Sequence, residues 1–318
     1  MAINLLNIEP HKVSRDLSGY ITYIYGLPKT GKTTLAVQMP DCLLLAFEKG
    51  YNALPGVMAQ DLTSWTDLKT VLRELKKTEV KQVYKSIVVD TVDIAAELCQ
   101  KYICNQNGIS SLGELGYGKG WTAFKEEFHS VFRGLTQLGY AVFFIGHSKE
   151  VVSEDGKTHI IRPALTNTTR TIVTGMSDII GFAHQEAGQK MSVLTLRSED
   201  DNVECGCRFK YITPEIPMSY NNLVAAVKEA IDKEAAEHDN KFVTDEKEKT
   251  VEVTSYDFNA LMDEFKGYVK KLIDDDENNG ARITHVVESY LGKGKKASDL
   301  IPSQAEFLYL IVEELKTL

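Results

Sequence analysis

The sequence predicts an α/β fold in which a mainly parallel sheet is flanked by helices, followed by a small helical domain at the C-terminus. Over the first 185 residues, short β-rich runs alternate with longer helical patterns, which is typical of a parallel sheet wrapped in helices. Two of the runs, LLLAF and AVFFI, are apolar at every position. Because such strands have no polar side, helices must cover both faces of the sheet.

Seven runs are the expected strands, of which the first five form the centre of the sheet and the last two extend it. They are residues 21–25, 42–47, 86–90, 141–145, 178–183, 191–197 and 207–212. Two segments between them follow the i, i+3, i+4, i+7 spacing of an amphipathic helix. Their apolar positions are Leu68, Val71, Leu72 and Leu75 in the first, and Trp121, Phe124, Phe128, Val131, Phe132 and Leu135 in the second. A helix over 221–237 closes this part of the chain.

The expected core domain therefore covers residues 1–237, and two further segments follow it. Residues 238–256 are polar, with mixed charges and no apolar period, and are expected to be a linker. Residues 257–318 contain helical patterns at 258–273, 283–291 and 303–315. The side chains expected to form their modest core are Phe265, Val269, Val286, Tyr290, Leu300, Phe307 and Ile311.

Composition excludes several classes of protein. The 318 residues are 43% hydrophobic and 25% charged, which excludes disorder as a description of the whole chain. No apolar run approaches the roughly 20 residues needed to cross a bilayer, and the sequence does not open with a secretory signal. No membrane partner is expected. The five cysteines are odd in number and lack a framework spacing, which indicates reduced thiols in a cytoplasmic protein.

The net charge of −9 is unevenly distributed along the chain. Residues 1–230 hold 24 basic and 25 acidic side chains, whereas residues 231–318 hold 12 basic and 20 acidic ones. The acidity therefore belongs to the C-terminal part. A nearly neutral core can carry a local basic groove, so composition neither supports nor excludes a DNA partner.

A phosphate-binding loop follows the first expected strand. Residues 26–33 fit the pattern G-x-x-x-x-G-K-T and lie between a strand and a helical run. The backbone amides of such a loop close around phosphate oxygens, Lys32 can bridge β- and γ-phosphate oxygens, and the Thr33 hydroxyl can bind Mg²⁺. The loop residues expected to bind the nucleotide are Gly26, Pro28, Lys29, Thr30, Gly31, Lys32, Thr33 and Thr34.

Asp90 ends the apolar run IVVD, the pattern by which a neighbouring strand positions Mg²⁺ through a water. The run is common by itself and becomes informative beside the phosphate loop, so Thr33 and Asp90 are the expected Mg²⁺ site. The guanine-reading pattern Asn-Lys-x-Asp has one near match at residues 240–243, where Val243 replaces the Asp. The sequence therefore favours ATP over GTP.

Two more polar residues end expected strands. Glu48 follows LLLAF, at the sheet edge where open α/β sheets bind ligands. It can orient a water for in-line attack on a γ-phosphate, although an exposed loop acid fits the spacing equally well. His147 follows AVFFI and could sense the γ-phosphate, but a single histidine is more often structural.

These features, in this order, resemble the RecA-type ATPase core, a P-loop NTPase. More closely, the chain is similar to the RecA-like phage nucleotide-binding proteins of the AAA-labelled group that includes the Sak-type single-strand annealing ATPases. The segments that carry the resemblance are GLPKTGKTTLAVQMPDCLLLAFEKG, YKSIVVDTVD, ELGYGKGW and FFIGHSK. It covers roughly residues 20–215, and only the phosphate loop is specific by itself.

The resemblance implies a RecA-like fold, ATP and Mg²⁺ as cofactors, and catalytic roles for Lys32, Glu48 and His147, with Asp90 as the acid of the second strand. It also implies two loops that hold single-stranded DNA, at residues 115–121 and between Lys149 and Thr169. Both contain the glycines, aromatic faces and cations that single-strand binding needs. The DNA-binding candidates are Tyr117, Lys119, Trp121, Lys149, Lys157, Arg162 and Arg170. Two ordinary interpretations stay open, namely that Trp121 belongs to the core and that residues 155–156 form a hairpin turn.

RecA-like ATPases complete their site with a cation from a neighbouring subunit, so a homo-oligomer, as a ring or a filament, is implied. Arg197, Arg208 and Lys210 are the candidate cations, and no motif chooses among them. The C-terminal domain is expected either to bind a partner such as a single-strand binding protein or to dock on the next protomer. If the chain is phage-encoded, its compartment is the cytoplasm of the bacterial host.

The expected function is ATP-dependent binding of single-stranded DNA, with ATP hydrolysis, that promotes annealing or strand exchange in phage recombination. One alternative is an annealing module that uses ATP as a conformational ligand with little turnover. Another is a ring-shaped DNA motor or loader. The same motifs serve all three, because binding and hydrolysis share the phosphate loop.

Overall fold

The computed structural model describes residues 8–152, 158–185, 191–198, 202–247 and 256–318. The chain divides into two compact units, residues 1–251 and residues 252–318. Each unit has its own apolar core and is described by itself.

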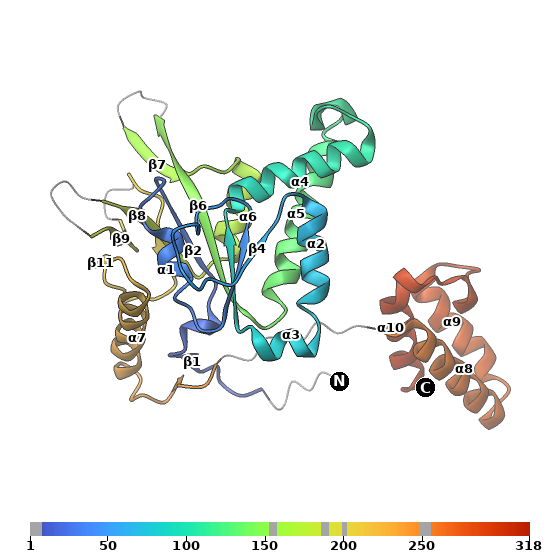
Figure 1. Ribbon diagram of the computed structural model, residues 1–318. Helices are drawn as coiled ribbons and strands as arrows, with labels where there is room; N and C mark the ends of the chain where they lie inside the picture. Colours follow the sequence, from blue (N-terminus) through green and yellow to red (C-terminus); the bar gives the residue numbers. More distant parts are fainter. Residues whose placement is uncertain (1–7, 153–157, 186–190, 199–201, 248–255) are drawn as a thin grey trace. The chain divides into compact units, whose positions relative to one another are not determined.

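The first unit is built on one ten-stranded sheet (Figure 1). Its parallel part has the strand order β4-β3-β5-β6-β2-β8. These strands are β2 (Thr22–Gly26), β3 (Cys42–Ala46), β4 (Ala59–Asp61), β5 (Ser86–Asp90), β6 (Ala141–Val152) and β8 (Ile179–His184). Strand β2, which leads into the phosphate loop, therefore lies between β6 and β8. The carboxyl ends of all these strands meet at one edge of the sheet.

Short antiparallel strands extend the sheet at two places. Strand β7 (His159–Pro163) pairs in antiparallel fashion with the far half of β6. Residues 155–156, to which the hairpin interpretation assigns the turn, lie outside the described residues. Strands β9 (Val193–Thr195), β11 (Glu215–Pro217) and β10 (Gly206–Cys207) lie on the β8 side. The strand predicted over 207–212 is wrong beyond its first residue, because the chain turns at 210–211.

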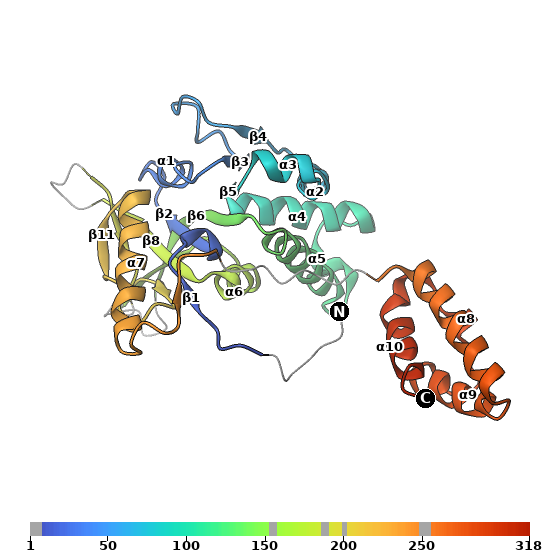
Figure 2. The same ribbon diagram turned by 90° about the horizontal axis from the view of Figure 1, so that it is seen from below.

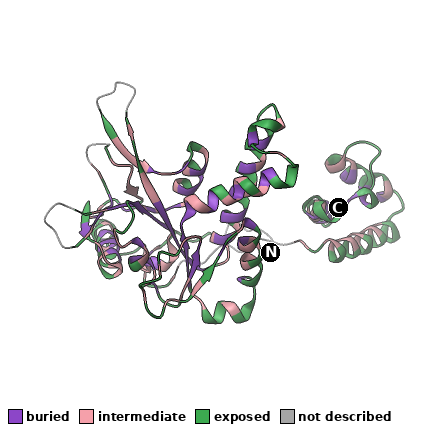
Figure 3. Cartoon of the chain, turned by 45° about the horizontal axis from the view of Figure 1, so that its top comes forward, coloured by how far each residue is buried: buried purple, intermediate pink, exposed green. Residues whose placement is uncertain are grey.

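Helices cover both faces of the sheet, as predicted. Helices α2 (Trp65–Glu74), α4 (Val92–Asn107), α5 (Lys119–Thr136) and α6 (Asn167–Met176) lie on one face, and α1 (Lys32–Ala36) and α7 (Tyr220–Ala236) lie on the other (Figure 2). A short helix, α3 (Thr78–Val83), precedes β5. Tyr23 and Tyr25 of β2 join the first core and Ile24 joins the second. Figure 3 shows the resulting buried centre.

The predicted aromatic stripe of helix α5 packs into the core, except at its first position. Phe124, Phe128 and Phe132 are buried, and Trp65 of α2 stacks on Phe128 with ring centroids 6.0 Å apart. Trp121 is 48% exposed, so its interpretation as a core residue is wrong. The inward position of that first turn belongs to Gly120, where an added Cβ would lie 2.1 Å from the Leu112 carbonyl oxygen.

The first part of the segment predicted as a linker is packed on the first unit. Strand β12 (Val243–Thr244) pairs in parallel with β1 (Val13–Ser14). The Ser14 hydroxyl donates to the Glu246 carbonyl oxygen at 2.7 Å, and Arg15 forms an ion pair with Asp245 at 3.3 Å. Backbone pairing of this kind needs no apolar period, so the sequence pattern did not indicate it. The core therefore extends beyond residue 237, and residues 248–255 of the predicted linker lie outside the described residues.

The second unit is a bundle of three helices, α8 (Phe258–Asp275), α9 (Asn279–Leu291) and α10 (Ala305–Leu315). Two short 3₁₀ turns, η4 (Ala297–Asp299) and η5 (Pro302–Gln304), join the last two helices. Val286, Leu300 and Ile311 are buried as predicted, but Phe307 is 45% exposed. The inward stripe of α10 instead contains Leu308, which leaves Phe307 on another side of the helix. None of the helices in the described ranges is long and apolar enough to cross a membrane.

Candidate functional site

The phosphate loop connects β2 to α1, and its two glycines are required for different reasons. Gly26 pairs with His147 on one side and with Ala183 on the other. A Cβ at Gly26 would lie 2.2 Å from the Ala183 carbonyl oxygen, so only glycine allows β8 to approach so closely. Gly31 has φ +93°, a left-handed conformation that disfavours other residues, and it directly precedes α1.

A cavity of about 490 Å³ lies over this loop, at the carboxyl edge of the sheet. Three neighbouring strands contribute to it through Glu48 after β3, Asp90 at the end of β5 and His147 in β6. Its lining residues are Pro28, Lys29, Gly31, Lys32, Thr33, Thr34, Glu48, Lys49, Gly50, Asp90 and His147. Of the predicted loop residues, Gly26 and Thr30 do not line it, and the Thr30 hydroxyl donates to the Leu27 carbonyl oxygen at 3.0 Å.

The oxygen atoms needed for Mg²⁺ lie together in this cavity. The Thr33 hydroxyl donates to Asp90 Oδ2 at 2.7 Å, while Asp90 Oδ1 is buried without a hydrogen-bond partner. A Cβ added at Gly50 would lie 3.3 Å from Thr33 Oγ1 and 3.5 Å from Asp90 Oδ2, so the glycine keeps space open beside both oxygens. One carboxylate, one hydroxyl and an open space fit Mg²⁺, which shares its remaining ligands with water and phosphate.

Within the described ranges, no three His, Cys, Asp or Glu side chains are grouped so that they could hold a metal ion by themselves. A metal that depends on the nucleotide's phosphates for ligands does not need such a group. The donor set at Thr33 and Asp90 therefore suits Mg²⁺ that arrives with a nucleotide.

Burial shifts both charges at the base of the cavity. Lys32 is 6% exposed, and its ammonium donates to the carbonyl oxygens of Gly26 at 3.0 Å and Leu27 at 2.7 Å. Burial lowers the pKa of Lys32, and the nearby Asp90 carboxylate opposes that shift. Burial also raises the pKa of Asp90 to about 6, although the Thr33 hydrogen bond opposes it. In a nucleotide complex, phosphate oxygens would pair with the Lys32 ammonium and Mg²⁺ would pair with the Asp90 carboxylate, in place of the water that burial removes from both groups.

His147 lies between two carboxylates. Its Nδ1 is 2.6 Å from Asp93 Oδ2, and its Nε2 is 3.7 Å from Glu48 Oε1. The His147 backbone N–H also donates to Asp93 Oδ1, at 3.3 Å. The hydrogen bond to Asp93 raises the pKa of His147, with a smaller contribution from the charge of Glu48. Asp93 thus holds both the ring and the backbone of His147, with Nε2 turned toward Glu48.

Sequence reasoning did not identify Asp93. It stands three residues after Asp90, in the first turn of α4. Since β5 and β6 are parallel neighbours with Asp90 opposite Ile145, His147 lies just beyond the end of β5, where α4 begins. The available signal was an acid directly after the strand that ends in Asp90, and a single acid at a helix start is usually only a capping residue.

The first predicted DNA loop presents its aromatic side chains to solvent. Tyr117 is fully exposed and has φ +47°, between Gly116 and Gly118, which also have positive φ. Lys119 begins α5 and is exposed, and Trp121 follows in the same turn. The loop therefore offers two aromatic faces and a cation to a ligand.

The cations of the second predicted DNA loop have partners within the chain. The Lys149 ammonium donates to the Leu165 carbonyl oxygen at 2.7 Å. Arg162 and Arg170 both face the Glu204 carboxylate, from Nε at 3.4 Å in Arg162 and from Nη1 in Arg170. Lys157 lies outside the described residues.

The three candidates for a cation that acts on a neighbouring subunit also have partners in their own chain. Arg197 donates to the carbonyl oxygens of Phe209 and Lys210, at 3.1 and 2.9 Å. Lys210 forms an ion pair with Glu237 at 2.9 Å. Arg208 pairs with Asp178 at 2.9 Å and keeps 67% of its side chain exposed. Arg208 thus keeps more of its side chain exposed than Lys210, of which 56% is exposed.

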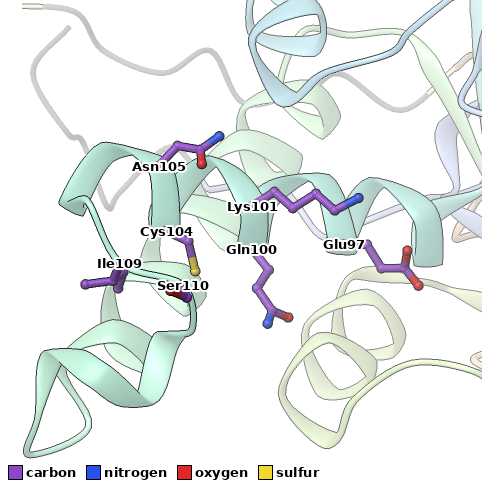
Figure 4. A pocket seen from close by; sticks show the side chains of 7 residues that line it. All are labelled: Glu97, Gln100, Lys101, Cys104, Asn105, Ile109 and Ser110. Atoms are coloured by element: carbon purple, nitrogen blue, oxygen red, sulfur yellow. The ribbon is translucent and has the colours of Figure 1, made fainter.

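A separate cavity of about 550 Å³ lies along α4, on the side chains that Figure 4 labels. Glu97, Gln100 and Lys101 project from the helix, and Ile109 and Ser110 close the far end where the chain leaves α4. Of the predicted site residues that lie in the described ranges, none lines this cavity. The phosphate cavity is therefore the one that gathers the predicted chemistry.

Comparisons with known proteins bear on the same region. A family model described as an AAA domain matches residues 18–204, a span that contains every residue lining the phosphate cavity. The SPbeta prophage-derived uncharacterized protein YorG of Bacillus subtilis (strain 168) is 30% identical over 328 aligned residues, which cover 100% of this chain and 99% of the relative. Among solved structures, the crystal structure of the RadB recombinase aligns with a TM-score of 0.36 and 17% identity, over 56% of this chain and 80% of that one.

Proposed function

Because the chain belongs to the AAA domain family, we propose that it is an ATP-dependent, RecA-like protein that binds single-stranded DNA and promotes annealing or strand exchange in phage DNA recombination. The fold is that of a RecA-like P-loop NTPase. The observation that carries the proposal is the single cavity in which the phosphate loop, Asp90, Glu48 and His147 lie together. The prophage origin named for the relative supports the phage context.

The proposed reaction is hydrolysis of ATP to ADP and phosphate. A water attacks the γ-phosphorus, the bond to the bridging β–γ oxygen breaks, and the water's proton passes to Glu48. Lys32 turns its ammonium from two loop carbonyls to the β- and γ-phosphate oxygens. Thr33 and Asp90 would hold Mg²⁺, which offsets charge on the phosphates when it is bound.

In this scheme His147 contacts the γ-phosphate end of the cavity, and Asp93 positions it. The two contacts from Asp93 fix the ring so that Nε2 faces Glu48 and the space beside it. A protonated imidazole there would donate to a γ-phosphate oxygen and lose that partner after phosphate leaves. His147 belongs to β6, and the far half of the same strand pairs with β7. A shift of His147 would therefore be transmitted along β6 to the second proposed DNA loop.

The proposed DNA contacts are centred on Tyr117, Lys119 and Trp121, whose exposure supports stacking on unpaired bases and contact with phosphate. Lys149, Lys157, Arg162 and Arg170 remain proposed contacts of the second loop. The proposed protein assembles from several copies, and Arg197, Arg208 or Lys210 of one copy reaches the nucleotide of a neighbour. A single-strand binding protein is a further proposed partner.

The deciding experiment is the rate of phosphate release measured without polynucleotide, with single-stranded DNA and with duplex DNA. We expect hydrolysis that single-stranded DNA stimulates. Lys32→Ala should abolish it, whereas Glu48→Gln should retain ATP binding and slow turnover by roughly 100-fold or more. A Glu48→Gln protein that hydrolyses ATP at the parental rate would remove Glu48 from the mechanism. ATP-dependent strand pairing without phosphate release would instead favour the annealing module, and directional unwinding of a forked duplex would favour a motor.

A further inference from the structure

The second unit contains an apolar groove that its own core does not fill. The groove has a volume of about 570 Å³, within the range of small-ligand and peptide-anchor pockets. Its apolar floor is formed by Met262 and Phe265 of α8 and by Ile283 and Val287 of α9, and Ala297 closes one end. Ile283 and Val287 are buried, so the floor is held in place by the packing of the bundle.

Lysines line the rim of this groove. Lys266 of α8, Lys295 and Lys296 all line it and are all exposed. The lining also contains one acidic side chain, Glu288, whose Oε1 accepts the backbone N–H of Gly294 at 2.7 Å, so positive charges outnumber negative ones by three to one. Lys266 also lies 3.6 Å from Asp263, an exposed pair of the kind that contributes little.

This positive rim stands out against the charge of its surroundings. Residues 257–318 hold 8 basic and 12 acidic side chains, so the segment as a whole is negative. Three of the eight cations nevertheless line one apolar groove. The loop that carries two of them is shaped by Gly292 and Gly294, which have φ +96° and +80°, and by the contact with Glu288.

We propose that this groove binds an acidic segment of another protein, with one or two large apolar side chains of that segment buried between α8 and α9. The apolar floor would supply burial, and the lysine rim would select carboxylates beside the anchor residues and orient the segment. Nucleic acid fits less well, because the floor is mainly aliphatic and single-strand sites rely on aromatic platforms. The inference does not depend on ATP hydrolysis.

The test is fluorescence anisotropy with the full chain and no nucleotide. The probe is a fluorescein-labelled ten-residue peptide that combines four aspartates with one leucine and one phenylalanine. Two control peptides replace either the aspartates or the two apolar residues with serine. We expect saturable binding of the probe alone, and an affinity that falls as salt is raised.

Two variants test the two halves of the proposal, each with a matched control. The double substitution Lys295→Glu and Lys296→Glu should weaken binding at least about tenfold, whereas Lys270→Glu with Lys271→Glu, exposed on α8 outside the groove, should change it less than about twofold. Thr284→Trp should block the groove, because Thr284 lines it and is exposed. His285→Trp, the exposed neighbour outside the lining, should not. None of the four touches the buried core, and circular dichroism checks that each bundle is intact.

Several results would overturn the proposal. One is a probe that binds no better than its serine-substituted controls, or that binds equally to the Lys295→Glu, Lys296→Glu protein. Another is loss of affinity for a single-stranded oligonucleotide in that variant with peptide affinity unchanged, which would assign the lysines to nucleic acid. A change of sedimentation with Thr284→Trp but not with His285→Trp would assign the groove to a second copy of the chain.

Discussion

Asp93 determines how His147 is placed in the phosphate cavity. Its carboxylate contacts the ring and the backbone of His147, and this places an imidazole, rather than a mobile loop side chain, beside Glu48. The side chains of Asp93 and His147 are 15% and 24% exposed, so solvent screens their interaction only in part. A change at Asp93 should therefore act through the protonation and orientation of His147.

We expect Asp93→Asn to keep nucleotide binding while lowering kcat about tenfold or more. Because the Asp93 hydrogen bond raises the pKa of His147, the wild-type imidazole keeps its proton to higher pH. The asparagine variant should lose activity at lower pH on the alkaline side of its kcat–pH profile. Glu97→Gln, an exposed change on the same helix, is the control. An unchanged alkaline limb would exclude Asp93 as a positioning residue.

Asp90 is needed for the proposed activity but lowers the stability of the folded protein at neutral pH. Burial raises its pKa to about 6, above the value of about 3.9 expected in the unfolded chain. The folded protein therefore disfavours the charged carboxylate, so Asp90 costs stability at pH above 6, and the cost disappears as pH falls from 6 to 4.

Asp90→Asn should accordingly stabilise the protein by about 1–3 kcal/mol at pH 7.5 in EDTA, seen as a rise of a few degrees in Tm. The same substitution should abolish hydrolysis. The stability gain should shrink toward pH 4, where the wild-type side chain is neutral as well. A lower Tm for the variant at pH 7.5 would contradict this account of Asp90.

Among the elements, the turn after β3 has a specific part in the cavity. It brings Glu48, Lys49 and Gly50 against the phosphate loop, and Gly50 leaves the space beside Thr33 and Asp90 open. Gly50 is exposed and has no left-handed φ. A methyl group there meets functional oxygens but no core side chain.

Gly50→Ala should therefore reduce affinity for ATP in the presence of Mg²⁺ by about tenfold, with Tm nearly unchanged, as for other surface substitutions. Isothermal titration calorimetry with and without Mg²⁺ measures the effect. Gly175→Ala in α6, where an added Cβ meets nothing within 4 Å, is the matched control. Equal Mg²⁺-dependent affinities for the two variants would show that the space beside Thr33 is not used.

The elements also explain how far the sequence could predict the fold and the site. Long apolar runs and the phosphate-loop pattern act locally, so β2, β3, β5, β6, β8 and the loop itself were predictable. Strands β4 and β11 are three residues each and depend on partners distant in sequence, so no local pattern marks them. Asp93 meets His147 across 54 positions only because β5 and β6 are neighbours. Phe307 and Trp121 show that an aromatic residue near a helix start can fall outside the stripe.

For the whole molecule, the division into two units has a measurable thermodynamic consequence. The phosphate cavity lies entirely in the first unit, and the second unit has its own core of residues such as Val286, Leu308 and Ile311. A ligand stabilises only the cooperative unit that binds it, by about 2.7 kcal/mol at a concentration of 100 Kd.

Differential scanning calorimetry should therefore resolve two transitions, of which only one moves when ADP and Mg²⁺ are added. The moving transition should carry the larger enthalpy, because the first unit contains more residues. Lys32→Ala should remove the shift and leave the other transition in place. A single transition that moves as a whole would mean that the two units unfold together.

The pairing of β1 with β12 has a consequence for biosynthesis. The ribosome makes residues 13–14 early, but their partner strand at 243–244 emerges only after the whole sheet has been translated. Until then the backbone N–H groups of Val13 and Arg15 lack the carbonyl oxygens of Phe242 and Thr244 that accept them in the finished fold, so this pairing waits until residue 244 of 318 has been made. Chains that stop before residue 243 lack the pairing of β1 with β12. The unpaired β1 segment is therefore a feature by which proteases can distinguish unfinished chains from finished ones.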